Sequence, residues 1–157
     1  MNARDVGALV LAAGRGTRMK SSRPKVLFEV GGEPMVAWVV RAARAAGAGR
    51  VVCVVGHGAD AVEAEVEARF PGLARFARQT ELLGTGHAAR VGLEALSDLE
   101  GPVLILSGDV PLLEAASLEA LLDEVEPGRR PVALLTTVLE DPTGYGRVLR
   151  DEAGHVV

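Results

Sequence analysis

The apolar residues of this chain follow two alternating patterns. Short continuous apolar runs occupy residues 6–11, 51–55 and 103–106, and runs of this length are typical of strands that are buried on both faces. Between the first two runs, apolar residues recur every three or four positions, as they do along one face of a helix. The residues of this face are Met35, Trp38, Val39, Ala42 and Ala46. Pro34 suits the first turn of this helix, and Gly47 suits its end.

The same patterns predict the remaining elements. Residues 59–69 alternate glutamate with apolar residues as a strand would, but their length and their alanine and glutamate content favour a helix. Its inward residues would be Ala59, Val62, Val66 and Phe70. A third strand is expected within residues 70–77, after the turn at Pro71 and Gly72. Two more helical faces and a fifth strand follow: Ala88, Val91 and Ala95; Leu118, Leu121, Leu122 and Val125; and residues 132–138.

Strands and helices therefore alternate through the whole chain, which indicates an α/β fold. The pattern predicts a Rossmann-like, mostly parallel sheet with helices on both faces and right-handed crossovers. The 157 residues suit one domain, and a composition of 48% hydrophobic and 24% charged residues is that of a globular protein. Only 3% of the residues are aromatic, so the core is expected to consist of alanine, valine and leucine.

Charge and cysteine content argue against several classes of protein. The 17 basic and 21 acidic residues give a net charge of −4 without a long basic run, so no nucleic-acid partner is expected. The single cysteine, Cys53, allows neither a disulfide framework nor a cysteine-based metal site. The apolar run of residues 6–13 is too short for a signal peptide, and no apolar stretch approaches the length of a membrane span. We therefore expect a cytoplasmic protein without a membrane partner.

A glycine loop with basic residues follows the first strand. Gly14 and Gly16 permit a sharp turn and a close approach of backbone N–H groups to an anion, while Arg15, Arg18 and Lys25 add positive charge. The loop lacks the third small residue of a dinucleotide fingerprint, and it lacks the Gly-Lys-Ser/Thr of a Walker loop. An ordinary glycine turn with solvated charges is the remaining alternative. The interpretation we favour is a binding site for a triphosphate.

Polar residues also follow the third and fourth predicted strands, where ligands of open α/β sheets bind. Asp109 is placed as a strand-end carboxylate that binds Mg²⁺ beside substrate phosphates. The amide of Gln79 offers both a donor and an acceptor to the edge of a base, and Gly84 allows close backbone approach. A turn aspartate and a solvated glutamine are the alternatives.

No general base is assigned to His57 or His87. If the reaction at such a site is the attack of a second phosphate on the triphosphate, the attacking oxygen is already ionised at neutral pH, so positioning and charge neutralisation suffice. We expect His87 to cap or pack at a helix start and His57 to lie in a tight Gly-His-Gly loop.

Residues 11–19 read Leu-Ala-Ala-Gly-Arg-Gly-Thr-Arg-Met and are followed by Pro24 and Lys25, which resembles the signature of the sugar-phosphate nucleotidyltransferases. Four further segments occur in the same order as in the N-terminal uridylyltransferase domains of the bacterial bifunctional N-acetylglucosamine-1-phosphate uridylyltransferases. They are residues 55–58, Gln79 with residues 83–88, residues 108–111 and residues 141–147. The resemblance implies the nucleotide-diphospho-sugar transferase fold. It also implies transfer of UMP from UTP to N-acetylglucosamine 1-phosphate with Mg²⁺ as cofactor.

Two other functions stay open. A related nucleotidyltransferase, such as the guanylyltransferase of molybdopterin or another sugar-phosphate nucleotidyltransferase, is the nearer alternative. A nucleotide-binding module without turnover is the more distant one.

The loop and the resemblance together imply roles for individual residues. The expected nucleotide-binding residues are Leu11, Ala12, Ala13, Gly14, Gly16, Lys25, Gln79, Gly84 and Thr85. Arg15, Arg18 and Lys25 would act on the triphosphate, with the division of work between the two arginines open. Gly108, Asp109 and Gly146 would bind the sugar-phosphate substrate, and Asp109 would also bind the metal. Leu82 stands where the family often carries a glutamine, which bears on the selectivity for uracil.

The resemblance finally implies how the chain is organised. In the family, further sugar-binding and metal-binding residues and a trimerising acetyltransferase domain would follow Val157. We therefore expect residues 1–157 to form a nucleotidyltransferase domain that is C-terminally incomplete and lacks the rest of its sugar-binding half. Such a chain should bind UTP with Mg²⁺ and turn over weakly.

Overall fold

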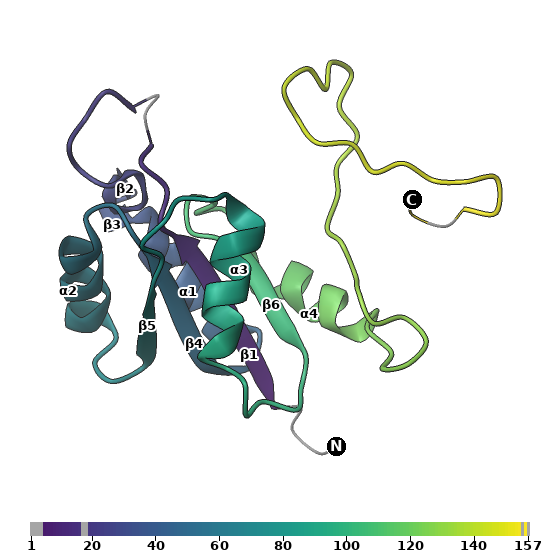
Figure 1. The fold of residues 1–157 in the computed structure, drawn as a ribbon, viewed down its shortest axis with the longest axis horizontal. Helices are drawn as coiled ribbons and strands as arrows, with labels where there is room; N and C mark the ends of the chain where they lie inside the picture. Colours follow the sequence, from purple (N-terminus) through teal and green to yellow (C-terminus); the bar gives the residue numbers. More distant parts are fainter. Residues whose placement is uncertain (1–4, 17–18, 155, 157) are drawn as a thin grey trace.

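A four-stranded parallel sheet forms the centre of the computed structural model, which describes residues 5–16, 19–154 and 156. The strands are β1 (Val6–Ala12), β4 (Ala48–Val55), β5 (Ala74–Arg78) and β6 (Val103–Ser107). Their spatial order is β5-β4-β1-β6, and all three pairings are parallel (Figure 1). The predicted α/β class and the parallel sheet are thus confirmed.

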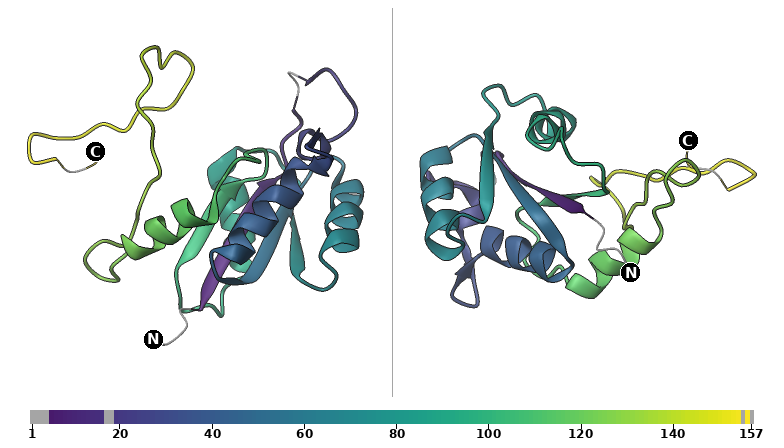
Figure 2. Two further views of the ribbon diagram at one scale, coloured as in Figure 1. Left: turned by 180° about the vertical axis from the view of Figure 1, so that it is seen from behind. Right: turned by 90° about the horizontal axis from the view of Figure 1, so that it is seen from below.

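Helices cover both faces of the sheet. α1 (Met35–Ala45), α2 (Ala59–Arg69) and α4 (Ala115–Asp123) lie on one face, and α3 (Thr85–Glu94) lies on the other (Figure 2). Alternate residues of β1 face the two layers: Ala8 and Val10 pack below α1, whereas Leu9 packs with Val52 and Leu96 below α3. This double burial explains the continuous apolar runs in the strands. No helix in the described part of the chain has the length and apolar character that a membrane span requires.

The buried face of α1 is broader than the helical spacing predicted. Val36, Val40 and Ala43 are fully buried in addition to most of the predicted face, because α2 and α4 flank α1 on this side of the sheet. Trp38, which was expected to point inward, is instead half-buried at the rim. Its indole Nε1 donates a hydrogen bond of 2.8 Å to the carbonyl oxygen of Val30.

A short hairpin connects the glycine loop to α1. The 3₁₀ turn η2 (Lys25–Leu27) leads into β2 (Glu29–Val30), which pairs antiparallel with β3 (Glu33–Pro34). Gly31 and Gly32 form the turn between them with φ values of +62° and +82°, a conformation that two-residue hairpin turns require and that glycine adopts without strain.

Residues 132–138 do not form the predicted fifth strand. After α4 the chain leaves the layered body as an extended coil (Figure 1), in which Val132 is 73% exposed and Val138 is 99% exposed. A strand needs a hydrogen-bonded neighbour as well as a face to bury. Among the described residues, none pairs with the free edge of β6 to supply that neighbour. The apolar pattern alone therefore predicted one strand too many in the sheet.

Candidate functional site

A cleft of about 750 Å³ lies at the carboxyl ends of β1, β5 and β6. Its lining contains ten of the predicted site residues: Leu11, Ala13, Gly14, Arg15, Gly16, Lys25, Gln79, Gly84, Thr85 and Asp109. They come from the end of β1 with the loop and η2 that follow it, from the segment between β5 and the first residue of α3, and from the loop after β6. The fold therefore gathers segments that are far apart in the sequence at one edge of the sheet.

Three of the predicted site residues that the structure describes are not in this lining. Ala12 is buried at the end of β1 and Gly108 is buried beneath the cleft, where its N–H donates to the carbonyl oxygen of Leu11 at 2.9 Å. Gly146 lies on the exposed segment after α4 and does not line the cleft. Arg18 lies outside the described residues.

Lys25 and Asp109 meet in this cleft. The Nζ atom of Lys25 lies 2.6 Å from Oδ2 of Asp109, although 84 positions separate the two residues in the chain. Their side chains are 39% and 33% exposed. Ion pairs with this much solvent contact contribute about 1 kcal/mol or less to stability, so a charged ligand can separate the two groups at low cost. Both are available to a phosphate or a cation.

Glycines allow the backbone around Lys25 to pack closely. Gly16 has a φ of +58°, and a Cβ atom on it would lie 2.7 Å from Cβ of Lys25. Gly58 has a φ of +67°, and a Cβ atom there would lie 2.4 Å from Cγ of Pro24. The loop before Lys25 is therefore held against the start of α2. Sequence reasoning missed this supporting role of the Gly-His-Gly segment, for which the two closely spaced glycines were the available signal.

Gln79 is the buried polar residue of the cleft. It is only 5% exposed, and its backbone N–H donates to the carbonyl oxygen of Val55 at 2.8 Å, which continues the pairing of β4 and β5 by one residue. Its side-chain Nε2 lies 3.3 Å from the carbonyl oxygen of Gly84 and 2.9 Å from Nδ1 of His87. His87, expected to pack at a helix start, indeed lies in the first turn of α3 and contacts the amide of Gln79.

Sequence reasoning also missed other lining residues, which are Met19, Val26, Ala88 and Ser107. Ser107 is the last residue of β6 and is exposed, so it brings a hydroxyl group to the same edge as Asp109. Its position directly before Gly108 and Asp109 was the signal that could have identified it.

One carboxylate, that of Asp109, belongs to the cleft lining. The described residues contain no group of three or more histidine, cysteine, aspartate or glutamate side chains that could hold a metal by themselves. Burial raises the pKa of Cys53 to about 12, so this thiol stays protonated in the core below the cleft. A single carboxylate suits Mg²⁺, which usually keeps waters and shares its remaining ligands with substrate phosphates.

The chain is similar in sequence to known NTP transferase domains. The profile of the MobA-like NTP transferase domain matches residues 8–156. The bifunctional protein GlmU of Trichlorobacter lovleyi is 52% identical over 151 residues, which are 95% of this chain and 32% of that protein. The GlmU of Pelobacter propionicus is 50% identical over 155 residues, which are 98% of this chain and 33% of that protein. The chain thus spans about a third of the length of these curated relatives.

Solved structures show the same fold. A nucleotidyl transferase from Methanothermobacter thermautotroptrophicus superposes with a TM-score of 0.62 and 27% identity, and the match covers 75% of this chain and 56% of that one. Rv0371c from Mycobacterium tuberculosis also has a TM-score of 0.62, with 26% identity over 78% of this chain and 61% of that one.

Proposed function

Because the chain belongs to the family of MobA-like NTP transferase domains, we propose that its cleft binds UTP and transfers UMP to N-acetylglucosamine 1-phosphate. The contact between Lys25 and Asp109 carries the proposal. A lysine ammonium group, which can bind a phosphate, lies beside a carboxylate, which can bind a cation, in a cleft that the glycine loop also lines. The choice of UTP and of the sugar phosphate rests on the resemblance of the segments around Gln79 and Asp109 to the uridylyltransferases.

The reaction needs positioned charges rather than a base. A phosphate oxygen of the sugar phosphate bonds to the α-phosphorus of UTP, the bond from that phosphorus to the bridging oxygen breaks, and pyrophosphate leaves. The attacking oxygen is already ionised, so catalysis consists of alignment and charge stabilisation. Lys25 and Arg15 bind the triphosphate, and the backbone at Gly14 and Gly16 lets it approach closely.

Asp109 is the residue that would hold a divalent cation. The carboxylate is free for this task once Lys25 turns to the triphosphate, and an oxygen ligand is the kind that Mg²⁺ prefers. When bound, the ion would neutralise charge on the phosphates. A crystal structure of Rv0371c is a complex with manganese, so Mn²⁺ belongs beside Mg²⁺ in any assay of this chain.

A substrate panel tests the proposal. Calorimetry with UTP, CTP, GTP and ATP measures binding, and pyrophosphate release with several sugar 1-phosphates measures turnover, each with Mg²⁺ and with Mn²⁺. We expect UTP to bind most tightly and pyrophosphate release to require N-acetylglucosamine 1-phosphate. A preference for GTP would indicate a guanylyltransferase, and binding without any pyrophosphate release would indicate a binding module. Absence of binding by all four nucleotides would overturn the proposal.

A further inference from the structure

The amide of Gln79 has its orientation fixed by neighbours on the protein side of the cleft. Its Nε2 atom lies within hydrogen-bond distance of the Gly84 carbonyl oxygen and of Nδ1 of His87. An amide nitrogen carries two hydrogens, so these two contacts use both of them. The Oε1 atom has no hydrogen-bond partner among the described residues. It is also not one of their fully buried atoms that lack a partner, so part of its surface is open to solvent. With Nε2 held on the protein side, Oε1 is the atom of this amide that can accept a hydrogen bond from a ligand in the cleft.

The reverse orientation of the amide is less favourable. It would place Oε1 at 3.3 Å from the Gly84 carbonyl oxygen, so that two acceptors would face each other in a nearly buried site. Gly84 cannot easily turn its carbonyl away, because its oxygen also accepts the N–H of Ala88 at 3.1 Å in the first turn of α3. The Gly84 carbonyl oxygen therefore favours Nε2 on its side.

His87 completes this arrangement only in one tautomer. Its Nδ1 lies 2.9 Å from Nε2 of Gln79 and 3.0 Å from the carbonyl oxygen of Glu81. If Nδ1 carries the proton, it donates to Glu81 and opposes the amide hydrogens of Gln79. If Nδ1 carries the lone pair, it accepts from Gln79, and the Glu81 carbonyl oxygen still accepts the N–H of Leu83 at 2.9 Å and is reached by water, because its contact with His87 is exposed. Two satisfied amide hydrogens favour the second state.

We propose that His87, with an unprotonated Nδ1, is the positioning residue that fixes the Gln79 amide with Oε1 facing the nucleobase. This inference rests on the proposed function and adds a specificity rule to it. An acceptor in the cleft selects bases whose ring nitrogen carries hydrogen, which is N3 of uracil or N1 of guanine. The ring nitrogens of cytosine and adenine at the matching positions are acceptors, and Oε1 repels them.

Two variants with the same number of side-chain heavy atoms separate this role from packing. His87→Asn keeps an acceptor, because Oδ1 of asparagine can take the place of Nδ1, whereas His87→Leu removes it. The measurement is calorimetry of UTP and of CTP on the full 157-residue chain. We expect the ratio of UTP to CTP affinity to fall about tenfold in His87→Leu, the scale of one lost or inverted hydrogen bond. We expect His87→Asn to keep the ratio of the unmodified protein.

The outcomes distinguish the inference from the proposed function. If the unmodified chain binds no nucleotide, or binds all four equally, the proposed function fails. If it prefers UTP and His87→Leu keeps that preference, the positioning role fails while the function stands. An equal loss in His87→Asn and His87→Leu would show that the imidazole acts by packing.

A spectroscopic measurement decides the tautomer without any ligand. Nitrogen-15 NMR of the unmodified protein distinguishes a protonated from an unprotonated ring nitrogen. We expect Nδ1 of His87 to be the unprotonated nitrogen and Nε2 to carry the hydrogen at neutral pH. A proton on Nδ1 would overturn the proposal even if a His87 variant failed to fold.

Discussion

At the scale of single residues, the main feature of the cleft is that its lysine and its aspartate neutralise each other. Lys25 and Asp109 are about one third exposed, so their attraction is screened and their separation costs about 1 kcal/mol or less. A triphosphate with a divalent cation offers each group a more strongly charged partner. Under the proposed function, the pair would keep both side chains close to the positions in which they bind ligand, and a ligand could still separate them.

Replacing Lys25 tests its role on the triphosphate. We expect Lys25→Ala to lower kcat/KM about 10²-fold, the scale on which one preorganised charge stabiliser acts. Pyrophosphate release measures the rate, and Arg23→Gln is the matched control because Arg23 is an exposed cation two positions away that does not line the cleft. A loss of thermal stability with unchanged kinetics would show that Lys25 is structural.

Replacing Asp109 tests the carboxylate with little change of shape. We expect Asp109→Asn to abolish turnover while the midpoint of thermal unfolding stays within the small range that an exposed ion pair allows. Asp60→Asn, which breaks the 2.6 Å contact of Asp60 with Arg78 outside the cleft, is the control and should leave turnover intact. An unchanged rate of Asp109→Asn at limiting Mg²⁺ would remove Asp109 from the site.

At the scale of elements, the sequence could predict the helices and strands, because these depend on the local pattern of apolar and polar residues. The buried strands and α1, α3 and α4 follow from apolar patterns, because each buries apolar residues against its neighbours in the layered fold, whereas α2 follows from its length and its alanine and glutamate content. Contacts between residues far apart in the sequence carried no such signal, because the contact of Lys25 with Asp109 depends on how the fold brings η2 to the loop after β6. The contact of His87 with Gln79 was likewise not predictable, since it depends on the backbone conformation at Gly84.

The predicted strand at residues 132–138 shows the limit of pattern reasoning. Its apolar and β-branched residues are typical of a strand, but pairing depends on a neighbour that local sequence does not specify. The same limit applies to Trp38, whose helical position was predicted correctly while its burial depended on how the hairpin sits beside α1. The position of a helix or strand in the sequence is therefore easier to predict than the elements against which it packs.

The contact of Gly58 with Pro24 links α2 to the segment that carries Lys25. Gly58 and Gly72 have nearly the same φ, +67° and +66°, but only Gly58 has a neighbour within 4 Å of the Cβ position. We expect Gly72→Ala to cost about 1 kcal/mol for the left-handed conformation. Gly58→Ala should cost about 1–3 kcal/mol more for the clash and should also weaken UTP binding. Chemical denaturation and calorimetry measure the two effects, and equal costs for both variants would contradict this account.

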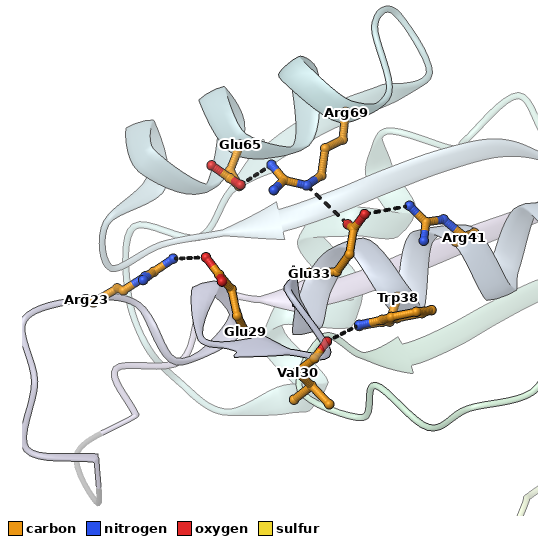
Figure 3. A network of polar contacts seen from close by, with 8 residues as sticks. All are labelled: Arg23, Glu29, Val30, Glu33, Trp38, Arg41, Glu65 and Arg69. Carbon is orange, nitrogen blue, oxygen red and sulfur yellow. Dashed lines mark hydrogen bonds and ion pairs between the residues drawn. The ribbon is translucent and has the colours of Figure 1, made fainter.

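The hairpin is tethered to two helices by a network of ion pairs. Glu33 of β3 accepts from Arg41 of α1 at 3.3 Å and from Arg69 of α2 at 3.2 Å, and Arg69 also binds Glu65 (Figure 3). The hydrogen bond from Arg41, with the added charge of Arg69, holds the pKa of Glu33 below its ordinary value of 4.5. The network fixes the hairpin directly after η2, which carries Lys25.

The lowered pKa predicts how this network responds to pH. A carboxylate with a lowered pKa in the folded state stabilises the protein above the ordinary pKa, and this contribution is lost as pH falls through the folded pKa. We expect Glu33→Gln to unfold at a lower temperature than the unmodified protein at neutral pH, and the difference to vanish as pH falls below 4.5. Thermal unfolding across pH measures this, with Glu119→Gln on the exposed side of α4 as control. A difference that persists at low pH would point to packing instead of charge.

At the scale of the whole molecule, the two edges of the sheet differ. α2 and the loop after it pack beside β5, whereas beside β6 lies an apolar groove formed with α4 and residues 131–135. Ile105 of β6 is 51% exposed, because α3 covers β1, β4 and β5 on this face and leaves β6 open. Among the described residues, none pairs with the outer edge of β6. A free edge with exposed apolar side chains is a template for pairing with another chain.

We therefore expect the chain to associate with itself through β6 as its concentration rises. Ile105→Lys should suppress this association, because a charged side chain on an edge strand resists pairing with a second copy. Val30→Lys is the matched control, since Val30 is an exposed apolar residue, 40% exposed, in the hairpin strand β2 away from this edge. Sedimentation velocity over a series of concentrations measures the effect. If Val30→Lys and Ile105→Lys reduced association equally, general surface hydrophobicity and not the β6 edge would be its cause. A sedimentation coefficient of the unmodified chain that did not change with concentration would contradict the prediction and show that the coil after α4 shields the edge.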